Sequence, residues 1–166
     1  MSNASNISGQ NFEATLTTIN QIYEERKLAR FRKVAPPTRT IGTGAFRRII
    51  YLENPFLDYV GCMASGRAMF FEAKSTAKPS LAAGGKDGFT EKQFNAMQDW
   101  RAAGAGAFLL WEYQGQGVRL FAECMIAAGL EERKSLVWYD GLEVPPGHGF
   151  IFYDFLKVVN QYPQIL

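Results

Sequence analysis

Cysteine and histidine are scarce in this chain, and long apolar segments are missing. The 166 residues include two cysteines, Cys62 and Cys124, and one histidine, His148, too few for the Cys/His sets that hold zinc. This count also argues against a disulfide framework and favours a reducing compartment. The longest apolar runs, Ala68–Phe71 and Ala105–Trp111, fall far short of the ~20 residues that a membrane span requires. We therefore expect a cytoplasmic protein without a membrane partner, in which any metal is held by oxygen.

Acidic residues are absent from the segment 26–48, which is strongly basic. Residues 1–50 carry eight Lys/Arg against three acids, whereas residues 51–166 carry ten against thirteen. A block of one sign is either a solvated face or tail, or a surface for a polyphosphate such as nucleic acid. Apolar residues interleave with these cations, which favours an ordered element that displays charge. The cations are Arg26, Lys27, Arg30, Arg32, Lys33, Arg39, Arg47 and Arg48.

The order of predicted elements indicates one α/β domain over residues 1–166 with a mixed central sheet. Apolar residues at helical spacing predict a helix over 10–29, and Thr90 is the expected N-cap of a second helix that ends near Ala103. A short terminal helix is expected at 154–160. Residues 36–55 form a basic insertion with a turn at 42–44. Strands are predicted at 56–63, 67–74, 107–113 and 118–124.

The predicted hairpin over 56–74 brings two carboxylates and a lysine together. Alternate strand residues share a face, so Glu72 and Lys74 lie side by side. A turn about Ser65 puts Asp58 opposite Glu72, and adjacent carboxylates repel unless a cation neutralises them. A divalent cation with oxygen ligands would do so, with Lys74 offsetting charge on a reacting phosphate. There are two alternatives to a cation site. One is a surface salt bridge among the three side chains, and the other is a register shifted by one residue, which would move Asp58 to the other face.

An ordered set of short motifs over about residues 8–113 resembles the PD-(D/E)xK nuclease superfamily and, more narrowly, the RecU-type Holliday junction resolvases. The resemblance implies a restriction-endonuclease-like core, a mixed sheet flanked by helices, with residues 36–55 as a protruding basic stalk. The motifs are Gly9-x-x-Phe12-Glu13, Lys33-Val34-x-Pro36-Pro37-Thr38, Asp58-Tyr59-x-Gly61, Phe71-Glu72-Ala73-Lys74-x-Thr76, Phe89-Thr90-x-x-Gln93 and Gly104-x-Gly106-x-Phe108-Leu109-Leu110.

The resemblance also implies the chemistry and its residues. It implies an endonuclease that hydrolyses DNA phosphodiesters with Mg²⁺ or Mn²⁺, through in-line attack by water that leaves 5′-phosphate and 3′-hydroxyl ends. Asp58 and Glu72 match the metal carboxylates, and Lys74 matches the residue that stabilises the transition state. Gln93 matches a further ligand or water-positioning group, and Glu13 matches the catalytic acid of the first helix.

The implied substrate is the four-way junction of DNA recombination and repair, which a symmetric homodimer cuts by paired nicks. The stalk would contact the junction centre. The absence of localisation signals fits a bacterial or phage-encoded protein of the cytoplasm. The residues expected to contact DNA are Arg30, Arg32, Lys33, Arg39, Arg47, Arg48, Lys78 and Lys86.

Two positions depart from the family pattern. Phe56 stands where the family has a threonine ligand, and Thr90 stands where a histidine opens the second helix. The stalk is also short, and residues 123–166 match nothing in the pattern. Two alternatives therefore stay open: another nuclease of this superfamily, of phage or mobile-element type, that cuts flaps or ends, and a non-catalytic protein that binds branched DNA.

Overall fold

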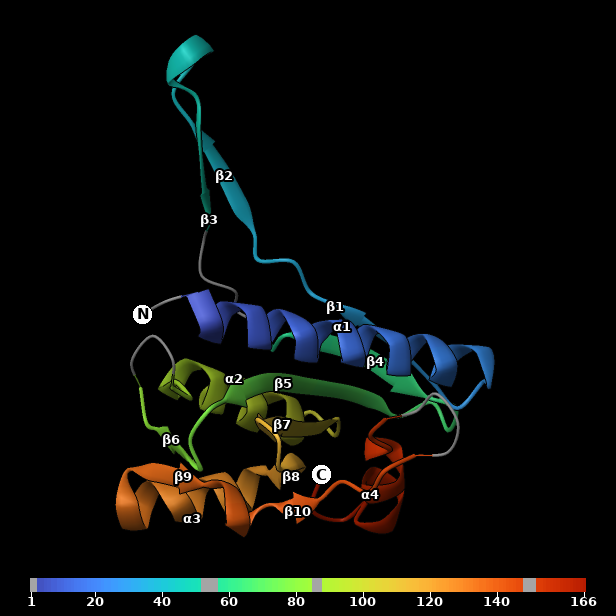
Figure 1. Cartoon of the computed structure of the whole chain (residues 1–166). Helices are drawn as coiled ribbons and strands as arrows, with labels where there is room; N and C mark the ends of the chain where they lie inside the picture. The colour runs from blue at the N-terminus through green and yellow to red at the C-terminus, as the bar shows by residue number, and fades with distance from the viewer. Residues whose placement is uncertain (1–2, 52–56, 85–87, 148–151) are drawn as a thin grey trace.

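A six-stranded mixed sheet lies at the centre of the structure, a computed structural model that describes residues 3–51, 57–84, 88–147 and 152–166 (Figure 1). The strand order is β1-β4-β5-β7-β8-β10. β5 and β7 run parallel, while the other neighbouring strands are antiparallel. The predicted mixed α/β class is thus confirmed. The strands are β1 (Ala29–Lys33), β4 (Tyr59–Met63), β5 (Ala68–Thr76), β7 (Gly106–Tyr113), β8 (Gly117–Ala122) and β10 (Leu142–Glu143).

Helices cover both faces of the sheet. α1 (Asn3–Glu25) and α4 (Phe155–Gln161) share one buried cluster with Phe71 and Phe108. α2 (Glu91–Ala102) and α3 (Glu123–Arg133) share the other with Phe70 and Leu109. Neighbouring strand residues point to opposite faces, so β5 and β7 supply both clusters. Among the described residues, no helix has the length and apolar character needed to cross a bilayer.

α1 begins and ends earlier than the predicted range of 10–29. Its stripe of Phe12, Leu16, Ile19 and Tyr23 is buried against the sheet, as the spacing predicts. The helix ends at Glu25 because Lys27 adopts a left-handed conformation with φ of 57°. The main-chain nitrogen of Leu28 donates to the carbonyl of Tyr23, and that of Lys27 to Glu24. These two bonds form a Schellman motif, which releases the chain into β1.

The basic insertion forms a hairpin that projects away from the rest of the molecule (Figure 1). β2 (Thr38–Ile41) and β3 (Arg48–Tyr51) pair only with each other, and the short 3-10 helix η1 (Gly44–Phe46) lies between them. At the predicted turn, Gly42 has φ of 79° and a Cβ there would meet the Phe46 carbonyl oxygen at 2.4 Å. The side chains of residues 38–50 are exposed, so the hairpin displays its arginines to solvent.

The sequence reasoning missed α3. It treated the chain beyond residue 124 as irregular, apart from the terminal helix, which the structure has as α4. Gly129 lies inside α3 and argues against a helix in the sequence, because glycine weakens a helix by about 1 kcal/mol relative to alanine. A Cβ at Gly129 would lie 2.9 Å from Leu136, on the strand β9 (Ser135–Val137) that pairs with β6 (Ser80–Ala82). The glycine thus allows α3 to pack closely against β9, a tertiary reason that local patterning does not contain.

Candidate active site

The hairpin β4–β5 places Asp58 beside Glu72. Its register pairs Tyr59 with Phe71 and Val60 with Phe70, which is the register predicted from a turn about Ser65, and it excludes the shift by one residue. The Asp58 main-chain nitrogen donates to Oε2 of Glu72 at 3.3 Å. Oδ2 of Asp58 accepts from the Ala73 main-chain nitrogen at 3.1 Å. The two carboxylates therefore lie at adjacent positions on one sheet face.

Glu72 is a buried acid held by a lysine and an amide. Its exposed fraction is 2%, and its Oε1 lies 3.0 Å from Nζ of Lys74. The same oxygen accepts a hydrogen bond from Nε2 of Gln93. Burial, followed by the charge of Asp58, raises the pKa of Glu72 to about 7, although Lys74 acts in the opposite direction. An additional positive charge beside the two carboxylates would favour their ionised forms.

Gln93 joins the start of α2 to this carboxylate. Thr90 is the N-cap of α2, as predicted, and its hydroxyl accepts from the Gln93 main-chain nitrogen at 3.2 Å. The Gln93 side chain completes the capping box, because its Oε1 accepts from the Thr90 main-chain nitrogen at 2.9 Å. The amide oxygen of Gln93 thus accepts from the helix N-terminus, while its amide nitrogen donates to Glu72. This arrangement fixes the position of α2 relative to β5.

Glu13 lies apart from this group. It stands on α1, which covers the opposite face of the sheet, and forms an ion pair with Lys33 of β1. None of the contacts among the described residues joins Glu13 to Asp58 or Glu72. Nor does the described part of the chain contain a cluster of three or more Asp, Glu, His or Cys residues suited to a metal. Phe56 and His148 lie outside the described residues.

The cations expected to contact DNA fall into two groups. Arg39, Arg47 and Arg48 are exposed on the hairpin, and Lys78 is exposed after β5. In contrast, Glu24 of α1 holds both Arg30 and Arg32, at 2.9 and 2.7 Å, and Lys33 is paired with Glu13. The sequence reasoning missed these pairs, because both acids precede the basic segment and meet it only through folding. Lys86 lies outside the described residues.

The structure is a helix-flanked mixed sheet whose antiparallel hairpin carries Asp58, Glu72 and Lys74 on one face. The family model described as "RecU: Recombination protein U" matches residues 7–124. The chain belongs to the RecU family of Holliday junction resolvases, endonucleases that hydrolyse DNA phosphodiester bonds.

A solved structure of Hjc, a Holliday junction resolvase from Archaeoglobus fulgidus, is similar to this chain with a TM-score of 0.46 and 17% sequence identity. The similarity covers 74% of this chain and 90% of that one. The comparison with curated proteins finds no match.

Proposed function

We propose that this protein resolves four-way DNA junctions by paired symmetric nicking, with Asp58, Glu72 and Lys74 as the reacting group in each subunit of a homodimer. The observation that supports this most directly is the convergence of the three side chains at one end of β4–β5, with Glu72 only 2% exposed. A buried acid beside a second acid is costly for folding alone. Such an arrangement is typical of a catalytic site.

The donor set fits a hard divalent cation, Mg²⁺ or Mn²⁺. Mg²⁺ is commonly held by one or two carboxylates together with water and substrate phosphate, which is what Asp58 and Glu72 offer. Oδ2 of Asp58 accepts from the Ala73 main-chain nitrogen at 3.1 Å, which holds this carboxylate in place beside Glu72. When bound, the cation would supply positive charge at the scissile phosphate and a lowered pKa for the attacking water.

The chain's own residues would orient the carboxylates and stabilise the transition state. Lys74 is partly exposed and in contact with Glu72, so its ammonium group borders both the carboxylates and the space that a phosphate would enter. There it would offset charge as the phosphodiester is attacked. We propose that Gln93 acts through its amide nitrogen by orienting Glu72, since its oxygen already caps α2. Glu13 remains a candidate catalytic acid.

The projecting hairpin would contact the branch of the junction. It displays Arg39, Arg47 and Arg48 on an exposed ribbon, and Phe46 near its tip is 83% exposed. Guanidinium groups bind phosphates, and exposed apolar side chains on DNA-binding proteins insert between base steps. The branch is the part of the junction where such steps are accessible. The hairpin therefore supports recognition of branched over linear DNA.

Incubation of the protein with labelled four-way junction, flap and linear duplex, each with Mg²⁺, Mn²⁺ or EDTA, tests the proposal. Paired symmetric nicks in the junction alone are expected, and EDTA should abolish them. Lys74→Ala should slow cutting by about 10²- to 10³-fold while junction binding stays nearly intact. Lys157→Ala, an exposed lysine of α4, serves as the matched control.

Other outcomes would replace this function with a different one. Degradation of ends or cleavage of flaps would indicate another nuclease of the superfamily. Tight junction binding without cutting under any metal would indicate a non-catalytic branched-DNA-binding protein. A fully active Lys74→Ala variant would remove the role assigned to this lysine.

A further inference from the structure

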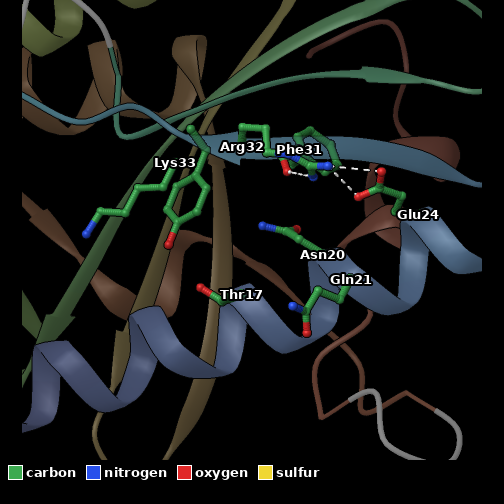
Figure 2. A pocket seen from close by; sticks show the side chains of 8 residues that line it. Thr17, Asn20, Gln21, Glu24, Phe31, Arg32 and Lys33 are labelled. Atoms are coloured by element: carbon green, nitrogen blue, oxygen red, sulfur yellow. Dashed lines mark hydrogen bonds and ion pairs between the residues drawn. The ribbon is translucent and has the colours of Figure 1, made fainter.

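A cavity of about 260 Å³ lies between α1 and β1, on the sheet face opposite to Glu72 and Lys74. Figure 2 shows Thr17, Asn20 and Gln21 on α1 facing Arg32 and Lys33 on β1 across this space. Its volume equals roughly nine waters at about 30 Å³ each. The cavity is smaller than the pockets of drug-sized ligands, and its size suits one flat ring system.

Two buried polar groups at this cavity lack hydrogen bonds of good geometry. Asn20 is 5% exposed and Tyr59 is 1% exposed, and both line the cavity. Among the described residues, neither Oδ1 of Asn20 nor the Tyr59 hydroxyl forms a hydrogen bond of good geometry, although the Thr17 side chain lies close enough to the Tyr59 hydroxyl to lower its pKa. The neighbouring Thr17 hydroxyl donates to the carbonyl of Glu13. Buried polar groups are almost always satisfied in folded proteins, so these two indicate a missing partner that offers both donors and acceptors.

The charges around the cavity argue against an anion as this partner. Arg32 is held by Glu24 at 2.7 Å, and Lys33 is held by Glu13, so each cation already has a carboxylate. A phosphate offers only acceptors and would leave the oxygen of Asn20 unsatisfied. Burial raises the pKa of Tyr59, and the nearby Glu13 and Asp58 raise it further, against a smaller opposing effect of the Thr17 side chain, so its hydroxyl stays protonated. The edge of a nucleobase carries the neutral donors and acceptors that amides and hydroxyls recognise.

The position of the cavity relates it to bound DNA. β1 leads into the projecting hairpin, with four residues between Lys33 and Thr38. The next residue, Val34, donates its main-chain N–H to the Asp58 carbonyl at 2.8 Å, and Tyr59 directly follows Asp58 in the chain. A group bound in the cavity would therefore lie beside both the base of the hairpin and the strand that carries the catalytic aspartate.

We propose that this cavity captures one nucleobase that leaves the helical stack next to the branch point of a bound junction, with Asn20 and Tyr59 as its hydrogen-bonding partners. The inference rests on the proposed function, because it requires branched DNA as the substrate. Bases at a branch lack a continuous stack on one side, so they are displaced more easily than bases inside a duplex. Capture would hold one strand in a defined register relative to the site.

A double-mutant cycle across the interface tests the proposal. Each nucleotide next to the branch is replaced in turn by an abasic nucleotide, and binding is measured in EDTA for wild type, Asn20→Ala and Tyr59→Phe. At one position per strand, the missing base should weaken wild-type binding by about 3- to 10-fold for each hydrogen bond that it makes. Each variant removes one of these bonds, so the difference in affinity between normal and abasic junctions should be smaller for each variant than for wild type. Tyr139→Phe, an exposed tyrosine, should behave as wild type.

The readouts separate this inference from its alternatives. Tyr59→Phe should melt no lower than wild type, because its hydroxyl forms no hydrogen bond of good geometry in the described structure; a clear loss of stability would indicate a structural role, for example through Thr17. Additive effects of the base and protein changes would show that the cavity holds only water. Weaker binding by the variants at every position, with a changed salt dependence, would indicate a phosphate instead. If wild type fails to bind junctions at all, the proposed function fails first.

Discussion

Removing two arginines from the hairpin should weaken junction binding in a way that depends on salt. Arg47 and Arg48 are exposed near the tip of the insertion, and neither forms an ion pair with any described residue. Each phosphate contact in B-form DNA contributes about −0.9 to the slope of log affinity against log salt. Arg47→Ala with Arg48→Ala should therefore make the slope less steep by about 1.8.

This change in slope converts into a measurable difference in affinity. Over a fourfold rise in salt, from about 50 to 200 mM, a slope change of about 1.8 corresponds to roughly a 12-fold difference. Wild type should lose that much more affinity than the double variant over this range. Fluorescence anisotropy of a labelled four-way junction in EDTA measures binding without cutting. The melting temperature should stay unchanged, because both side chains lie outside the buried clusters.

A second arginine pair on the same chain is the matched control. Arg30→Ala with Arg32→Ala removes the same formal charge, but Glu24 already holds both guanidinium groups, at 2.9 and 2.7 Å. Contacts with phosphate would have to displace these ion pairs, so the slope should change by less than half as much. An unchanged slope for the Arg47 and Arg48 variant, or equal changes for the two double variants, would refute the assignment of the hairpin as the phosphate-binding element.

Three further outcomes are expected. Gly61→Ala should lower the free energy of unfolding by about 3 kcal/mol in urea titration, since its Cβ would meet the Arg30 carbonyl oxygen at 2.3 Å; normal stability would contradict this packing. Burial and a 2.8 Å hydrogen bond to Asp154 raise the pKa of Tyr23. The contribution of the Tyr23 hydroxyl to the free energy of unfolding is therefore complete below about pH 10 and declines above it. Above about pH 10, the free energy of unfolding of wild type should fall by about 1.4 kcal/mol per pH unit more than that of Tyr23→Phe, as urea titration at a series of pH values would show. Mg²⁺ at about 100 times its dissociation constant should stabilise wild type by about 2.7 kcal/mol and Asp58→Asn far less, as thermal melting would show; equal shifts would place the cation elsewhere.

The register of the central hairpin was predictable because several local rules agree. Gly66 has φ of 88°, the conformation that glycine favours in a turn, and it follows Ser65 at the predicted bend. Phe71 must face the core, which fixes the faces of all its neighbours in β5. This register alone predicts that Asp58 and Glu72 lie opposite each other. This part of the site depends only on short-range geometry, which is why the sequence was sufficient.

Contacts between distant segments could not be predicted in the same way. The ion pairs of Arg30 and Arg32 depend on the turn at Lys27, which reverses the chain and brings Glu24 of α1 alongside β1. The periodicity predicts a helix up to residue 29, which would carry no such reversal. The left-handed residue that ends a helix is usually glycine and not lysine, so the sequence contained no signal that the helix ends near Lys27. The sequence pattern alone therefore did not show that Glu24 pairs with the arginines of β1.

The position of Gln93 shows how a helix end can determine the geometry of a site on a strand. Its amide oxygen accepts from the N-cap main chain, and this bond fixes which end of the amide faces Glu72, because only the nitrogen can donate to a carboxylate. A glutamate at this position would preserve the capping box but would direct its second oxygen at Glu72, where a third carboxylate would be repelled. A leucine would release both contacts. Glutamine satisfies the helix end and the buried acid together, so the capping box that starts α2 also holds Glu72 in position.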